Sequence, residues 1–124
     1  MAESLPSGIR LKNLIQDHHA EILERERNND KFIHLYNIGT YWVAFERSAC
    51  LLGSIFRRCE ISLFRVDGCP DYVVMASVSS DEAAVYFHEH IVCCDEPDYK
   101  VLLASPLLMR DYCKWHMDAV RAVL

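Results

Sequence analysis

The stretch Leu35–Ala49, LYNIGTYWVAFERSA, decides the fold of this chain. Apolar and aromatic side chains alternate over Phe32–Tyr36 and again over Tyr41–Phe45, a pattern typical of β-strands. The Asn37–Gly39 segment between them is a compact turn in which glycine can adopt a positive φ. We therefore expect an antiparallel hairpin, whose second strand places Tyr41, Val43 and Phe45 on one face and Trp42 and Ala44 on the other.

Helix and strand patterns alternate outward from this hairpin. Apolar residues recur at helical spacing from Ile9 to Leu23, with Ser7 as the expected cap, and a buried helix follows the hairpin over residues 45–58. The turn DGCPD, residues 67–71, separates two further expected strands. The remaining expected elements are strands at Ile61–Val66, Tyr72–Val78 and Ile91–Cys94, a helix capped by Ser79 or Ser80, and a last helix from Pro106 to Val123. Residues 99–105 form either a strand or a direct entry into that helix.

This order of hairpins and helices predicts one domain over residues 1–124. We expect an α/β (α+β) fold, in which helices pack over a mixed sheet of about five or six strands. No apolar run approaches the roughly 20 residues that cross a bilayer, and the N-terminus lacks the pattern of a signal peptide. We therefore expect a cytoplasmic protein without membrane contact.

The formal net charge is −5 and its distribution is uneven. Seven acids and no Lys or Arg lie from Asp71 to Asp98. Such a chain does not favour binding to a phosphate backbone, which usually needs a basic stripe. Arg57 and Arg58 are either a local basic patch or two solvated surface charges.

The six cysteines are expected to be unpaired buried thiols, because the expected compartment is reducing and Cys93 and Cys94 are adjacent. The segment HEHIVCCD brings His88, His90, Cys93 and Cys94 close in sequence, but zinc ligands usually come in separated pairs. On a helix the two histidines point roughly 200° apart, and adjacent cysteines on a strand face opposite sides. We therefore expect no metal site.

Catalytic signatures are absent from the sequence. A thiol nucleophile would need a nearby base and an oxyanion loop, and no glycine-rich phosphate loop, nucleophile elbow or HExxH motif is present. We expect a protein that is not an enzyme and carries no cofactor.

Two segments, FIHLYNIGTYWVAFERSACLLGSIF and YVVMASVSSDEAAVYFHEHIVCC, together resemble the N-terminal mismatch-recognition domain (domain I) of the DNA mismatch repair protein MutS. The resemblance covers about Ile9 to Cys94 and implies that fold. In the family a Phe-x-Glu motif after the glycine stacks on a mispaired base and hydrogen-bonds to it. Aligned through Gly39, Tyr41 stands at the Phe position and Val43 at the Glu position, where it can form no hydrogen bond.

Two functions follow as hypotheses. The first is a small non-catalytic binding module that contacts a protein partner through exposed aromatic edges or its acidic side, and a homodimer is compatible with it. The alternative is a nucleic-acid-binding protein that stacks bases on Tyr41 and Trp42 and contacts phosphates through Arg47, Arg57 and Arg58.

Overall fold

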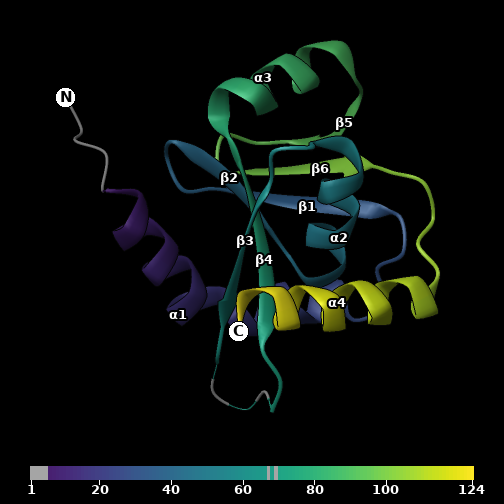
Figure 1. Cartoon of the computed structure of the whole chain (residues 1–124). Helices are drawn as coiled ribbons and strands as arrows, with labels where there is room; N and C mark the ends of the chain where they lie inside the picture. The colour runs from purple at the N-terminus through teal and green to yellow at the C-terminus, as the bar shows by residue number, and fades with distance from the viewer. Residues whose placement is uncertain (1–5, 67, 69) are drawn as a thin grey trace.

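The computed structural model describes residues 6–66, 68 and 70–124, and these residues form the expected α+β fold (Figure 1). The elements in chain order are α1 (Ser7–Glu26), β1 (Phe32–Asn37), β2 (Tyr41–Phe45), α2 (Glu46–Ile55), β3 (Glu60–Phe64), β4 (Val73–Ser79), α3 (Ser80–Glu89), β5 (Val92–Asp95), β6 (Tyr99–Leu103) and α4 (Met109–Val123). No described helix combines the length and the apolar character needed to span a bilayer.

The six strands form one sheet in the order β3-β4-β2-β1-β6-β5, and each of these pairings is antiparallel. The hairpin of β1 and β2 is confirmed, with Tyr36 opposite Val43. Residues 99–103 form a strand, which lies between β1 and β5. Figure 1 shows β3 and β4 crossing β1 and β6 at a steep angle, as expected where strand twist accumulates across a sheet.

Helices cover both faces of the sheet, which gives three layers. On one face, α1 packs through Ile22 against Val43 and Phe45 of β2 and their neighbours. On the other face, side chains of α2 and α3 pack against Trp42 and Ala44, and Trp115 of α4 joins the same cluster. The expected division of β2 into two faces is therefore confirmed for these four residues.

The helix ends differ from two expectations. Ser7 is not the cap of α1, because Pro6 holds the cap position and the Ser7 hydroxyl is hydrogen-bonded to that of Thr40 at 2.9 Å. The last helix begins at Met109 rather than Pro106, since the preceding segment is extended and the Leu107 N–H donates to the Asp30 carbonyl at 2.6 Å.

The predictions for the start of α3 and for the turn at residues 67–71 can be compared directly with the structure. Ser79 caps α3, because its hydroxyl accepts a hydrogen bond from the N–H of Glu82 at 3.3 Å. In the turn at residues 67–71, Gly68 has a φ of +82°, whereas Asp67 and Cys69 lie outside the described residues.

Alanine substitutions at two glycines are expected to change the free energy of unfolding in opposite directions. Gly39 has a φ of +107°, and an added Cβ would lie 3.2 Å from the Ser7 hydroxyl. Gly39→Ala is expected to lower the free energy of unfolding by about 1–2 kcal/mol. Gly53 lies within α2, where an added Cβ meets nothing within 4 Å, so Gly53→Ala is expected to raise it by about 0.5–1 kcal/mol. Urea unfolding of both variants measures this, and a loss of stability in Gly53→Ala contradicts the expectation.

Candidate functional site

The two aromatic residues expected to stack on bases lie on different sides of β2. Tyr41 is 40% exposed at the start of the strand. Trp42 is only 6% exposed, and its ring packs edge-on against Phe87 with the centroids 5.5 Å apart. Alternate residues of a strand face opposite ways, and helices α2 and α3 cover the face on which Trp42 lies, so Trp42 is in the core rather than at an exposed edge.

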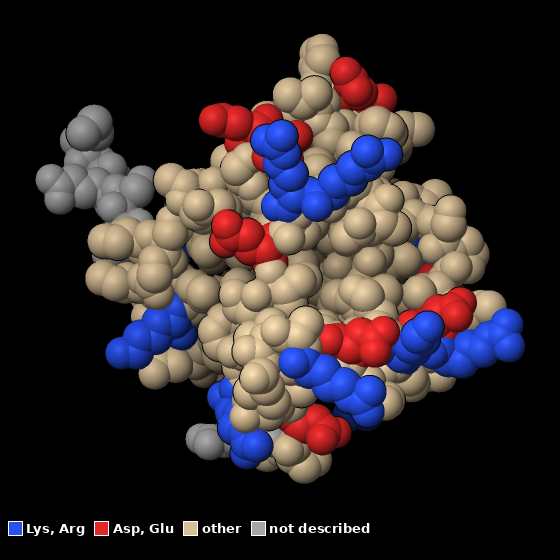
Figure 2. Space-filling model, in the orientation of Figure 1, with Lys and Arg blue, Asp and Glu red and all other residues tan. Residues whose placement is uncertain are grey.

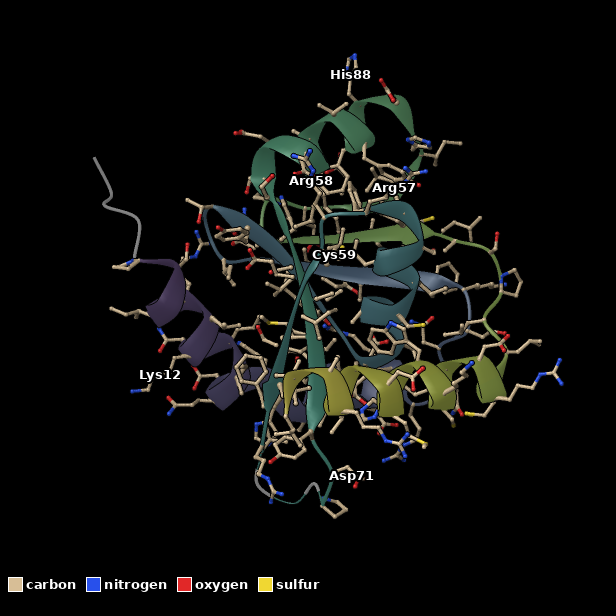
Figure 3. The ribbon with its side chains drawn as sticks, viewed as in Figure 1. Lys12, Arg57, Arg58, Cys59, Asp71 and His88 are labelled. Carbon is tan, nitrogen blue, oxygen red and sulfur yellow. The ribbon has the colours of Figure 1, made fainter. Side chains whose placement is uncertain are left out.

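The three arginines expected to contact phosphates lie in two places. Arg47 is in the first turn of α2, where its guanidinium donates to the Asn29 carbonyl and lies 5.1 Å from the centre of the Tyr112 ring. Arg57 and Arg58 follow the other end of α2, a helix of 10 residues or about 15 Å. Figure 3 places both beside α3, and in Figure 2 the blue groups in that region have red groups close by. The arginines do not form one basic surface with Tyr41.

The residues of the HEHIVCCD segment also lie apart. His88 projects outward from α3 (Figure 3), and the His90 ring stacks on Tyr86 with the centroids 3.8 Å apart. Cys93 is exposed and Cys94 half-buried on β5. Over residues 6–66, 68 and 70–124, no three His, Cys, Asp or Glu side chains are grouped as metal ligands.

The described cysteines are free: Cys50, Cys59, Cys93, Cys94 and Cys113. The expectation that they are buried is wrong for Cys93 and Cys113, which are exposed, and the other three are half-buried. The sixth, Cys69, lies outside the described residues. Burial raises the pKa of Cys50 and of Cys59 to about 11. Both thiols are therefore protonated at neutral pH, a state unsuited to nucleophilic attack.

A buried polar cluster joins the end of α1 to the start of α2. Glu26 is 3% exposed, and its carboxyl oxygens accept from the Ser48 N–H at 2.8 Å, the Ser48 hydroxyl at 2.6 Å and the Asn29 amide at 3.2 Å. The N-cap residue of α2, Phe45, has no side-chain acceptor for the free N–H groups of the first turn. Glu26 supplies that acceptor from another helix, so the cluster caps α2.

Glu46 adopts an unusual backbone conformation beside this cluster. Its φ is +52°, in the left-handed region that costs a non-glycine residue on the order of 1–2 kcal/mol. One carboxyl oxygen accepts from the N–H of Val74 in β4 at 2.7 Å, and the other accepts from the Tyr112 hydroxyl at 2.7 Å. Val74 is next to Met75, the residue that pairs with Phe45 at the end of β2. His116 Nε2 lies 3.4 Å from the first oxygen. Glu46 thus joins β4, α2 and α4.

Both carboxyl groups line a cleft of about 590 Å³, which we name the Glu46 cleft. Helix α1 forms one wall, the start of α2 and Tyr112 of α4 form the other, and Gly68 and Pro70 also border it. The α1 wall consists of His19, Ala20, Leu23, Glu24, Glu26 and Arg27. Arg27, which directly follows α1, and Arg47 of α2 also line the cleft, so acidic, basic and apolar groups face the same space.

Burial changes the proton affinity of groups in this cleft. Desolvation, with a smaller contribution from the charge of Glu46, raises the pKa of Glu26 to about 7 against the opposing effect of the Ser48 and Asn29 hydrogen bonds. Desolvation and the Glu46 carboxylate also raise the pKa of Tyr112, so that its phenol stays protonated and donates to Glu46. Among the described residues, no Lys or Arg forms an ion pair with Glu26 or Glu46.

Glu26, Glu46, Tyr112 and His116 were not predicted as site residues from the sequence. Glu26 lies in the charged segment ERERNND, which has the composition of a solvated helix end. Tyr112 and His116 are four residues apart and so share a helix face, which is the one signal the sequence contains for their proximity. No comparison with protein-family models, curated proteins or solved structures gave a match to this chain.

Proposed function

We propose that this chain is a non-catalytic binding module and that its Glu46 cleft receives the guanidinium group of an arginine from a protein partner. The observation that carries the proposal is the pair Glu26 and Glu46, two carboxyl groups that line one cleft without a Lys or Arg ion pair among the described residues. Carboxyl groups that pair with no Lys or Arg favour a cationic ligand, since ion pairing offsets part of their desolvation cost. Glu26 is buried, and Glu46 is partly exposed with the His116 imidazole 3.4 Å away.

The chemistry of the walls favours arginine over lysine. A planar guanidinium carries five donors in a rigid fork that matches carboxylate oxygens, whereas an ammonium is a compact and strongly hydrated charge. Leu23 and Ala20 supply apolar surface for the methylene stem of the incoming side chain. The strained backbone of Glu46 is consistent with a functional position, because such strain concentrates at ligand sites.

Binding is favoured over proton transfer because both carboxyl groups are held in the fold. Glu26 accepts from Ser48 and Asn29, and Glu46 accepts from Val74 and Tyr112. The resemblance to MutS domain I stays a prediction, and the proposed ligand does not depend on it.

The proposal predicts pH-dependent binding of N-acetyl-arginine amide. The cation favours ionised Glu26, whose pKa in the free protein is about 7. The dissociation constant is therefore expected to decrease by about tenfold between pH 6 and pH 8, as the carboxyl group loses its proton. Titration of ¹⁵N-labelled protein followed by NMR measures the constant and locates the shifted amides, which we expect at Ser48 and Glu46.

N-acetyl-citrulline amide is the matched ligand control, because it keeps the shape of arginine without the charge. It is expected not to bind. Glu26→Gln is expected to bind the arginine compound more weakly and without the pH dependence, whereas Asp17→Asn, at an exposed position of the same helix outside the cleft, keeps it. Equal binding of the arginine and citrulline compounds, or no shift at Ser48 and Glu46, contradicts the proposal.

A further inference from the structure

The Glu46 cleft contains groups of both charges that are not paired with each other. Arg27 and Glu24 of its α1 wall form an ion pair at 3.3 Å, so together they add no net charge. In the part of the chain that the structure describes, Glu26 and Glu46 form no ion pair with a Lys or Arg, and Arg47 forms none with an acidic residue. A ligand that carries two separated and opposite charges can therefore pair with both kinds of group.

The Arg47 guanidinium has donors left for an anion. It donates to the Asn29 carbonyl at 3.4 Å and to the Met109 sulfur at 3.3 Å. Both acceptors are uncharged, sulfur is a weak acceptor, and a guanidinium has five N–H donors in all. The nearby Tyr112 ring is also neutral, because burial and the Glu46 carboxylate raise the pKa of its hydroxyl. A carboxylate is thus the partner that Arg47 lacks among the described residues.

The Tyr112 side chain sets the spacing of the two charges. The Arg47 guanidinium lies 5.1 Å from the centre of the Tyr112 ring, and the hydroxyl at the end of that ring donates to Glu46 at 2.7 Å. The positive and negative groups therefore lie at the ring and at the hydroxyl of one tyrosine. In an extended arginine residue the guanidinium carbon lies about 7 Å from the carboxyl carbon. One arginine residue is thus long enough to contact both groups.

We infer that the Glu46 cleft recognises an arginine at the C-terminus of a protein chain, with its guanidinium at Glu26 and Glu46 and its free carboxylate at Arg47. The inference rests on the proposed function, because it names the class of arginine that the same cleft takes. An internal arginine has a peptide bond in place of the carboxylate and leaves Arg47 without an anion. A free amino acid adds an ammonium, for which no further unpaired acid lines the cleft among the described residues.

The test compares N-acetyl-arginine, which has a free carboxylate, with N-acetyl-arginine amide, which has none. Both are titrated at pH 8 into ¹⁵N-labelled protein and followed by NMR. N-acetyl-arginine is expected to bind about tenfold tighter, the usual effect of a hydrogen bond between charged groups. The amide signal of Arg47 is expected to shift with N-acetyl-arginine and to shift less with the amide compound. Free L-arginine is the third ligand and is expected to bind more weakly than N-acetyl-arginine.

Variants of Arg47 assign the preference to one side chain. Arg47→Gln is expected to reverse it, since the ligand carboxylate then meets only the acidic groups of the cleft. Arg47→Lys keeps the charge without the planar fork and is expected to keep only part of the preference. Arg58→Gln is the matched control, because Arg58 lies beyond the other end of α2, beside α3 (Figure 3), and it is expected to keep the full preference. Thermal unfolding confirms that each variant is folded.

The outcomes separate this inference from the proposed function. Tighter binding of N-acetyl-arginine than of its amide, reduced in both Arg47 variants and kept in Arg58→Gln, supports a site for a C-terminal arginine. Equal binding of the two compounds, or a full preference in either Arg47 variant, overturns the inference and leaves the cleft as a site for an internal arginine. Free L-arginine that binds as tightly as N-acetyl-arginine also overturns it. Binding of none of the three ligands overturns both the inference and the proposed function.

Discussion

Trp42→Ala is expected to lower the free energy of unfolding by about 3–5 kcal/mol, the usual cost of removing a buried indole. The side chain is 6% exposed and lies in the cluster between the sheet and helices α2 and α3. Its ring meets the edge of Phe87, and the Lys100 ammonium lies 5.6 Å from its centre. The substitution removes these contacts and leaves a cavity that the surrounding strands fill only in part.

Tyr41→Ala is the matched control for this effect. Tyr41 precedes Trp42 in the same strand but is 40% exposed, so its loss is expected to cost no more than about 1 kcal/mol. Chemical denaturation of the two variants measures the difference. Similar losses in both would contradict the division of the hairpin into a core side and an exposed side.

Stability is expected to fall as the pH rises from about 4.5 to 7, because Glu26 is more easily protonated in the folded chain. Its pKa is raised from 4.5 to about 7. Over that interval the folded state binds more protons than the unfolded state, so deprotonation favours unfolding. Below pH 4.5 the raised pKa of Glu26 contributes about 3 kcal/mol to the free energy of unfolding. This contribution is lost as the pH rises past about 7.

Glu26→Gln tests this assignment. Glutamine keeps an oxygen that accepts from the Ser48 N–H, and it replaces the oxygen that accepts from the Ser48 hydroxyl with an NH₂ donor, as protonation of that oxygen in glutamate would. The variant is expected to be more stable than the parent at pH 8 and to have a flatter stability profile below pH 7. Urea unfolding between pH 4 and pH 8 measures both, with Glu24→Gln as the surface control. A parent profile that rises through this interval would show that the cluster favours the ionised form.

The fold was predictable where the signals are local. The alternation of Tyr41–Phe45 and the glycine after Ile38 predict the β1–β2 hairpin, and the hydroxyl of Ser79 predicts the start of α3. The position of β6 between β1 and β5 depends on pairs such as Ile33 with Leu102, which are distant in sequence. No local pattern specifies such a pair.

The candidate site was predictable only in small part. A positive φ at Glu46 has no sequence signal, because that conformation usually indicates glycine or asparagine. Glu26 has the neighbours of a surface residue and becomes buried only when the start of α2 packs on it. Conversely, Tyr41 and Trp42 were predicted as base-stacking residues because both are aromatic. The aromatic pattern could not show that Trp42 is buried in the core while Tyr41 is exposed.

The place of β6 also determines when during synthesis the sheet can close. Strand β1 lies next to β6 over all five pairs from Phe32 with Leu103 to Tyr36 with Tyr99. A ribosome that has released only the first hundred residues therefore holds a nascent chain with β1 as a bare edge, and bare edges pair readily with other chains. Until the β6 segment leaves the exit tunnel, the growing sheet ends at β1, and it closes at this edge only when β6 pairs there.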